Sequence, residues 1–224
     1  MIPWKEIDRA KVPGDEGEVT LMVRDQEFSI RTAGTELMNS RIHGSEDALA
    51  QLACSRLNPK NKWQILIGGL GMGYTLAAAL EHSGPDTHIL VSELIPAVVR
   101  WNREHLGHLS GMPLNDPRVS VQEEDVVKII GHKKSAWDAI LLDVDNGPAG
   151  LTRKANDRLY GPAGLKSSFD ALRPGGILAV WSSGVDQAFT RRLILAGFKT
   201  EIVSVRARKS GKGSRHTIWL GKKI

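Results

Sequence analysis

The sequence predicts an α/β protein with a mostly parallel seven-stranded sheet, closed by a C-terminal antiparallel hairpin and preceded by a small N-terminal cap. From Trp63 onward, short strand-like runs alternate with helix-like segments, as in a parallel sheet with helices on both faces. Residues 199–207 and 215–223 both read as strands and are too close in sequence for a parallel crossover, so they must pair antiparallel. Residues 18–31 contain two short alternating runs, which predict a β-hairpin.

The N-terminal cap is expected to span residues 1–60. A helix follows its hairpin and runs through the apolar-periodic segment 48–57, with Ser45 as the N-cap residue. Asn58-Pro59 ends this helix. Residues 61–224 then form the second domain.

The second domain has the strand and helix order of a Rossmann-like fold. Its architecture resembles the class I S-adenosylmethionine-dependent methyltransferase fold, because the common dinucleotide-binding fold lacks the closing hairpin. The expected strands before the hairpin are 63–68, 87–93, 118–124, 137–143 and 175–182, and the expected helices are 74–83, 96–106, 126–134, 163–173 and 186–198.

Composition argues against a membrane protein and against a secreted one. No run approaches the roughly 18 apolar residues of a membrane span, and the first eight residues offer no signal peptide, so we expect a cytoplasmic protein without membrane contact. The net charge is +5, and basic residues gather between Arg206 and Lys223. Because of these basic residues, the C-terminal hairpin could bind a nucleic acid, although the sequence contains no nucleic-acid-binding motif.

Residues 65–75 read ILIGGLGMGYT and place four glycines after the first strand of the second domain. Ligands of open α/β sheets usually bind at this first strand-to-helix turn. A phosphate-binding P-loop needs a lysine where this chain has Tyr74, and a dinucleotide fingerprint needs a small residue there. We therefore expect a ligand without a pyrophosphate, such as the methionine and ribose parts of S-adenosylmethionine, to bind Gly68, Gly69, Gly71 and Gly73.

Acidic residues follow the next two strands. Glu93 ends the second strand, where a carboxylate can accept hydrogen bonds from both ribose hydroxyls. Asp125 follows the third strand and suits the adenine amino group, with Val126 against the ring. The alternatives for these residues are a surface glutamate and a solvated aspartate.

The fourth strand ends in Asp143, which should face the reactive sulfonium of the donor. Asp145 shares its face if the chain stays extended. Two acids there could orient or deprotonate an incoming amine, and Tyr160 could assist them. The Asp-x-Asp pattern also serves metal-dependent sugar transfer, but no nucleotide-diphosphate loop accompanies it, so we expect no metal. A structural capping role is the other alternative.

Taken together, these motifs resemble the spermidine synthase family of aminopropyltransferases over roughly residues 63–185. The resemblance implies that the glycine loop and Glu93 hold the methionine-derived part and the ribose, that Asp125 reads adenine, and that Asp143 serves the attacking amine. It also implies S-adenosylmethionine or its decarboxylated form as co-substrate. The matching segments are IGGLGMG, SELIPAVV, DPRVSVQEEDV, AILLDVDNGPAG and LYGPAGLKSSFDALRPGGILAV.

The chain departs from the family pattern on the acceptor side. The family has a second aspartate three residues after the first, and here that residue is Asn146, with an acid at Asp145 instead. The family's Tyr-His-Glu corresponds to Gly44-Ser45-Glu46, so only the glutamate remains. Both changes remove groups that would bind a polycation, so the resemblance supports the nucleoside half of the site more than the acceptor half.

Three functions stay open on the sequence alone. The first is transfer of an alkyl (aminopropyl) group to a small-molecule amine acceptor. The second is methyl transfer to a different, anionic substrate. The third is a non-catalytic nucleoside-binding role. An exposed N-terminal hairpin beside a helix would also suit a homodimer.

Overall fold

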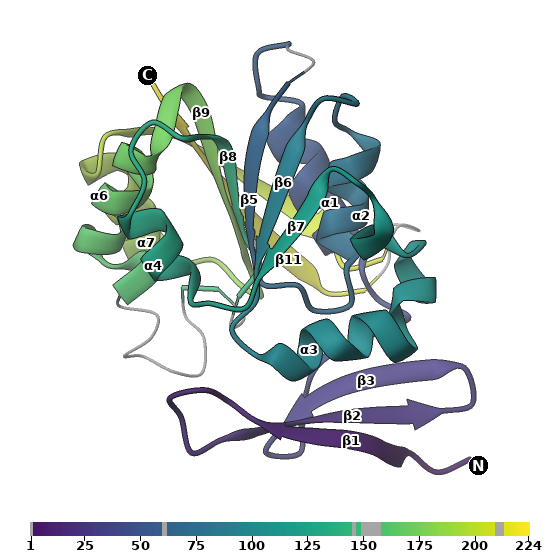
Figure 1. The fold of residues 1–224 in the computed structure, drawn as a ribbon. Helices are drawn as coiled ribbons and strands as arrows, with labels where there is room; N and C mark the ends of the chain where they lie inside the picture. The colour runs from purple at the N-terminus through teal and green to yellow at the C-terminus, as the bar shows by residue number, and fades with distance from the viewer. Residues whose placement is uncertain (1, 60–61, 145–146, 149–157, 209–212) are drawn as a thin grey trace.

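Two β-sheets organise the chain, whose structure is a computed structural model (Figure 1). It describes residues 2–59, 62–144, 147–148, 158–208 and 213–224. Within these residues no helix is long and apolar enough to cross a membrane.

The first sheet is antiparallel, with four strands in the order β1-β2-β3-β4. The predicted hairpin is its centre, where β2 and β3 pair and the turn passes through Asp25 at φ 55°. The flanking strands β1 and β4 were not predicted. The strands are β1 (Lys5–Lys11), β2 (Glu18–Arg24), β3 (Glu27–Thr32) and β4 (Thr35–Asn39).

The second sheet has seven strands in the order β10-β11-β9-β8-β5-β6-β7 and confirms the predicted fold class. The strands from β5 to β9 run parallel, while β11 pairs antiparallel with both β9 and β10. The strands are β5 (Gln64–Gly68), β6 (His88–Ser92), β7 (Val119–Gln122), β8 (Trp137–Leu142), β9 (Leu172–Ser182), β10 (Phe198–Arg206) and β11 (Arg215–Lys223).

Helices cover both faces of this sheet, and alternate strand residues point to them. Ile65 and Ile67 of β5 belong to the core beneath α1, α2 and α3, whereas Leu66 belongs to the core beneath α4, α6 and α7. Figure 1 shows α1 and α2 on one side of the sheet and α4, α6 and α7 on the other. The helices are α1 (Gly44–Cys54), α2 (Tyr74–Glu81), α3 (Pro96–Trp101), α4 (Val126–Gly131), α6 (Pro162–Ala171) and α7 (Gln187–Leu195).

Helix α1 begins earlier than expected and lacks the predicted cap. His43 is the N-cap residue, and Ser45 lies inside the first turn with its side chain fully buried. The Ser45 hydroxyl contacts Glu46 and His216 instead of the helix backbone. Helix α1 packs beside α2 and against β9 of the large sheet, while the small sheet ends at Asn39. The division at residue 60 stays a prediction.

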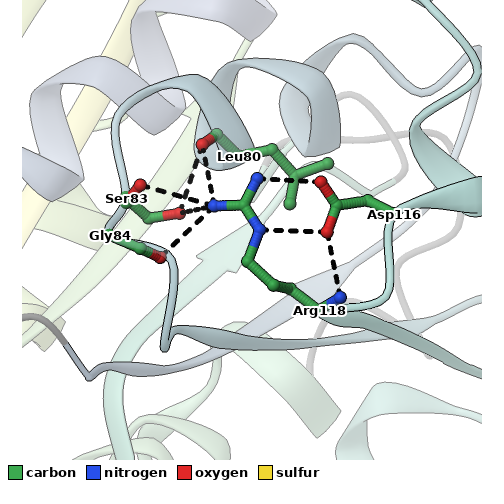
Figure 2. Close-up of polar contacts among 5 residues, drawn as sticks. All are labelled: Leu80, Ser83, Gly84, Asp116 and Arg118. Carbon is green, nitrogen blue, oxygen red and sulfur yellow. Dashed lines mark hydrogen bonds and ion pairs between the residues drawn. The ribbon is translucent and has the colours of Figure 1, made fainter.

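Arg118 directly precedes β7, and its side chain forms hydrogen bonds with backbone carbonyl groups at the C-terminal end of α2 (Figure 2). Its guanidinium donates to the carbonyl oxygens of Leu80 at 3.3 Å, Ser83 at 3.4 Å and Gly84 at 3.3 Å. Asp116 accepts from its Nε at 2.9 Å and from its terminal nitrogen at 2.8 Å. Carbonyl groups at a helix C-terminus lack partners within the helix, so a fixed cation there stabilises that end.

Candidate active site

Four predicted site residues lie where parallel strands of the large sheet end. Gly68 is the last residue of β5, and Glu93 directly follows β6. Asp143 directly follows β8, and Asp125 lies in the connection from β7 to α4. Carboxyl ends of neighbouring parallel strands meet at one edge of a sheet, which is the binding edge of open α/β folds.

The glycine loop is tightly packed against the end of β8. Gly69, Gly71 and Gly73 all have positive φ, at 88°, 53° and 81°, a region that favours glycine. A Cβ atom on Gly69 would lie 2.4 Å from the carbonyl oxygen of Asp143. A Cβ atom on Gly68 would lie 3.0 Å from the side chain of Val126. At Gly68 and Gly69 the absence of a side chain therefore lets the backbone of the loop pack directly against Val126 and Asp143.

Glu93 holds this loop in place. Its Oε2 accepts a hydrogen bond from the backbone N–H of Leu70 at 2.8 Å, and its Oε1 accepts one from Ile95 at 2.9 Å. Glu93 is 7% exposed, and burial raises the pKa of its carboxyl while the backbone N–H groups oppose that rise. Its carboxylate oxygens have further lone pairs. Binding of the ribose hydroxyls to them stays a prediction.

Asp125 begins α4 as its N-cap residue. Its Oδ1 accepts from the backbone N–H of Val127 at 2.9 Å, and its Oδ2 lies 3.8 Å from the guanidinium of Arg158. Val126 is buried and faces Gly68. These contacts bring Asp125 and Val126 to the same edge as the glycine loop, and their contact with adenine stays a prediction.

Asp143 and Glu46 place two carboxyl groups beside the loop, near enough for the charge of one to act on the other. The Thr75 hydroxyl donates to Asp143 Oδ2 at 2.9 Å and also lies 3.5 Å from the carbonyl oxygen of Glu46. Burial raises the pKa of Asp143 to about 6, against the opposing hydrogen bond from Thr75. Burial, followed by the charge of Asp143, raises the pKa of Glu46 to about 7. One end of the site can therefore accept or share a proton near neutral pH.

Behind Glu46 lies a contact that the sequence did not predict. Ser45 donates to Glu46 Oε2 at 2.6 Å, and its oxygen lies 2.9 Å from Nδ1 of His216 on β11. The retained glutamate of Gly44-Ser45-Glu46 was the available signal for this region. His216 is 171 residues from Ser45 in sequence, so no local pattern joins them.

Two other residues, Asp145 and Tyr160, were predicted to be catalytic. Asp145 falls outside the described residues. Tyr160 is 1% exposed in the core beneath α6 and α7, with its ring edge-on to Phe189 at 5.6 Å between centroids. Its assistance to Asp143 stays a prediction. Within the part of the chain that the structure describes, no three His, Cys, Asp or Glu side chains form a group that could hold a metal ion.

The family model of the spermine/spermidine synthase domain matches residues 44–194, which include the glycine loop and all the acidic residues above. The chain belongs to the spermine/spermidine synthase family. This family member is 32% identical over 121 residues to the polyamine aminopropyltransferase of Thermoanaerobacter sp. (strain X514), a match that covers 53% of this chain and 40% of that one. The matched part is thus less than half of that relative's length.

Solved structures agree with the fold of the spermine/spermidine synthase family. The spermidine synthase of Thermotoga maritima superposes with a TM-score of 0.76 at 19% identity, covering 98% of this chain and 73% of that one. A spermidine synthase in complex with the transition-state analogue AdoDATO gives the same TM-score and identity, covering 98% and 72%. The four-stranded sheet is thus part of the shared architecture, because the superposition covers nearly the whole chain.

Proposed function

We propose that this member of the spermine/spermidine synthase family transfers an aminopropyl group from decarboxylated S-adenosylmethionine to an amine acceptor. The observation that carries the proposal is the position of Asp143, at the end of β8, with Glu46 beside it and the glycine loop packed against its backbone. Family membership supports the reaction class. A spermidine synthase of this fold is known in complex with AdoDATO, which supports a donor site of the same kind here.

The donor would bind along the edge that the glycine loop forms. Gly68, Gly69, Gly71 and Gly73 would line the methionine-derived part and the ribose, with Glu93 accepting from the ribose hydroxyls. Asp125 and Val126 would contact adenine. A sulfonium is already activated, so the protein mainly has to align the nucleophile with the carbon–sulfur bond and exclude water.

The carboxyl groups favour the decarboxylated donor. Asp143 and Glu46 place up to two negative charges at the reacting end of the site. A donor that carries its own carboxylate would add a third negative charge in a buried region, where like charges repel strongly. A cationic aminopropyl donor and an ammonium acceptor would instead be attracted.

In the reaction, Asp143 would orient the acceptor and take its proton. The acceptor ammonium loses one proton, and the free amine then forms a bond to the propyl carbon. The carbon–sulfur bond breaks with its electron pair going to sulfur, which leaves neutral methylthioadenosine and a secondary ammonium. One proton is released overall, and a carboxylate with a pKa of about 6 is a suitable acceptor for it near neutral pH.

Product analysis tests the reaction. The protein would be incubated with S-adenosylmethionine or its decarboxylated form and a panel of amines, and products would be identified by mass spectrometry. Methylthioadenosine is expected; adenosylhomocysteine would show methyl transfer instead, and binding without turnover would favour a non-catalytic role.

The Asp143→Asn variant is expected to lower kcat by roughly 10²- to 10⁴-fold, because the amide cannot take a proton. Isothermal titration with the donor should show binding within about threefold of wild type, a small change in free energy by comparison. Asp86→Asn, on the exposed connection between α2 and β6, is the matched control. Equal turnover in Asp143→Asn and wild type would contradict the role given to Asp143.

A further inference from the structure

Thr75 contacts the carboxyl group that takes the proton in the proposed reaction. It is the second residue of α2 and is 3% exposed. Its Oγ1 donates a hydrogen bond to Oδ2 of Asp143 at 2.9 Å. Within the part of the chain that the structure describes, no other hydrogen bond reaches the carboxyl group of Asp143. Oδ1 is therefore the oxygen that an acceptor can use.

The hydroxyl of Thr75 has two oxygen atoms near it but only one hydrogen to donate. The carbonyl oxygen of Glu46 lies at 3.5 Å, whereas Oδ2 of Asp143 lies at 2.9 Å. Hydrogen bonds between a hydroxyl and an oxygen usually span about 2.5–3.0 Å. The hydrogen therefore goes to Asp143, and the carbonyl of Glu46 is at most a weak second acceptor.

Other side chains engage the carbonyl groups that would compete for this hydroxyl. A threonine in a helix often donates to the carbonyl oxygen three or four residues earlier. For Thr75 these are the carbonyl oxygens of Met72 and Gly71. The first accepts from Ser110 Oγ at 3.0 Å, and the second accepts from Asn102 Nδ2 at 2.7 Å. These contacts leave the hydroxyl free to donate outside its own helix.

We propose that Thr75 is a positioning residue that holds Oδ2 of Asp143, so that the acceptor amine binds to Oδ1 and passes its proton there. This inference rests on the proposed function, because it assigns one oxygen of Asp143 to the proton which that reaction releases. Thr75 acts through Asp143 and needs no contact of its own with either substrate.

Oδ1 suits the transfer because the contact with Thr75 survives it. The N–H bond of the acceptor ammonium breaks, its electron pair stays on nitrogen, and an O–H bond forms at Oδ1. Oδ2 is then the carbonyl oxygen of the acid and can still accept from Thr75. A proton on Oδ2 would instead face the hydrogen of Thr75, and the hydroxyl would have to turn to the more distant Glu46. Asp143 is partly exposed, so its proton can pass to water after the product leaves.

The same hydrogen bond sets the pH range in which Asp143 is ionised, because a donor to a carboxylate favours its charged form. Burial raises the pKa of Asp143 to about 6, and the hydrogen bond from Thr75 opposes that rise. Removal of the hydroxyl alone leaves the other titratable groups of the surrounding elements in place. These groups are Glu46 and Asp47 of α1, its N-cap residue His43, Tyr74 of α2, Glu93 after β6 and His216 of β11.

The first test follows the ionisation of Asp143 directly and needs no turnover. The ¹³C shift of its side-chain carboxyl would be measured in the full chain from pH 4 to pH 9, with Asp143→Asn identifying the signal. Thr75→Val should raise the midpoint by about one to two pH units, which corresponds to the loss of a hydrogen bond to a charged group. Thr75→Ser keeps the hydroxyl and should titrate close to wild type. An unchanged midpoint in Thr75→Val, or an equal rise in Thr75→Ser, would overturn the proposal.

The chain offers a matched control for this test. Thr87 is 2% exposed and directly precedes β6, at the edge of the sheet opposite to the candidate site. Its Oγ1 accepts a hydrogen bond from the backbone N–H of Trp63 at 3.4 Å. Thr87→Val should leave the midpoint of Asp143 unchanged, and an equal rise would refute the role of Thr75. Thr75→Ala, which puts no methyl group in place of the hydroxyl, should also raise the midpoint, and an unchanged midpoint there would refute that role as well.

The second test is the pH profile of kcat. Its acidic limb reports the ionisation of the base in the substrate complex, so Thr75→Val should move that limb to higher pH. At pH 7 the variant is expected to be about two- to tenfold slower than wild type, and at pH 9 nearly as fast, with KM for the donor nearly unchanged. An equal loss at both pH values would be a purely structural effect and would overturn the positioning role.

A crystal structure of the full chain decides which oxygen receives the proton. The chain would be crystallised with methylthioadenosine and an amine that product analysis identifies as the acceptor. The amine nitrogen should lie within hydrogen-bond distance of Oδ1, with Thr75 still on Oδ2, and an amine on Oδ2 would overturn the assignment. If the wild type turned over no amine, the proposed reaction would fail, and the carboxyl titration would still decide the contact between Thr75 and Asp143.

Discussion

At the scale of single residues, the site is built around carboxyl groups that the fold keeps from water. Glu46 and Asp143 come from different elements, and Thr75 contacts both. Their raised pKa values are a cost to the folded state, because each group would ionise more easily in the unfolded chain. Such perturbed groups are typical of functional sites, where stability is given up for reactivity.

This cost predicts a pH dependence of stability. The pKa of Glu46 rises from 4.5 to about 7 on folding, so the folded state binds more protons between these values and its free energy of unfolding falls as pH rises through that window. Glu46→Gln should therefore stabilise the protein at pH 8, by up to roughly 3 kcal/mol, and have little such effect at pH 4. Chemical denaturation at both pH values measures the difference.

Glu16→Gln, at an exposed glutamate between β1 and β2, is the control and should give the same change at both pH values. Equal effects of Glu46→Gln at pH 4 and pH 8 would show that Glu46 ionises as freely in the folded chain as in the unfolded one.

At the scale of elements, α2 is anchored at both ends. Its N-terminus emerges from the glycine loop, with Gly73 as the N-cap residue, and its C-terminal carbonyl groups lie against the guanidinium of Arg118 (Figure 2). A shift of this helix would move the loop and Thr75 with it. The contacts of Arg118 with the end of α2 thus help to fix the positions of the glycine loop and of Thr75.

Arg118→Met is expected to lower the free energy of unfolding by about 1–3 kcal/mol, because the methionine keeps the apolar stem but removes the guanidinium that donates to several carbonyl groups and to Asp116. Arg118→Lys should recover part of the loss, since an ammonium cannot make the paired contact with a carboxylate. Chemical denaturation measures both. Arg103→Met, at an exposed arginine, is the control, and a loss as large in that variant would contradict the assignment.

The sequence predicted those strands and helices whose residues follow a regular apolar pattern, and it missed elements that depend on tertiary contacts. The strands β5, β6 and β8 consist mainly of apolar residues, β7 alternates valine with polar residues, and the glycines and acids of the candidate site follow the ends of these strands. β1 reads KEIDRAK and is largely exposed, so it lacks the apolar alternation that marks a half-buried strand. Ser45 has the residue type of a helix cap, but tertiary contact with His216 places it inside the helix.

At the scale of the whole molecule, Asp8 of β1 is one of the residues that join the four-stranded sheet to the rest, beside the core that Val19, Leu21 and Ile30 share with the large sheet. The Asp8 carboxylate accepts from Trp101 Nε1 at 2.7 Å and forms an ion pair with Arg100. Figure 1 shows α3, which carries both partners, lying over the small sheet. The hydrogen bonds from Trp101 and then Arg100 lower the pKa of Asp8 to about 2.

Because the pKa of Asp8 is lower in the folded state than its usual 3.8, its stabilising effect is present above about pH 4 and is lost as pH falls toward 2. Asp8→Asn should lower Tm at pH 7 and speed proteolysis of the small sheet, with a much smaller effect at pH 2. Thermal unfolding and limited proteolysis measure these outcomes. Asp86→Asn is the control. If Asp8→Asn lowered Tm equally at pH 7 and pH 2, the ionisation of Asp8 would not contribute to stability as described.

Association between copies of the chain stays a prediction at this scale. The expected homodimer would use the exposed N-terminal sheet, and analytical ultracentrifugation of the wild type would measure the mass in solution.

The place of β11 has a consequence for how the molecule assembles. β11 lies between β9 and β10, so β9 and β10 have no partner on that side until β11, the last strand of the chain, inserts between them. The edge that carries the predicted site residues is made by β5 to β8 and their loops, whereas the contact of Ser45 with His216 joins residues 171 positions apart in sequence. Contacts so distant in sequence form late and slowly. During synthesis from the N-terminus, we therefore expect the edge that carries the glycine loop, Glu93 and Asp143 to form before the contact of Ser45 with His216.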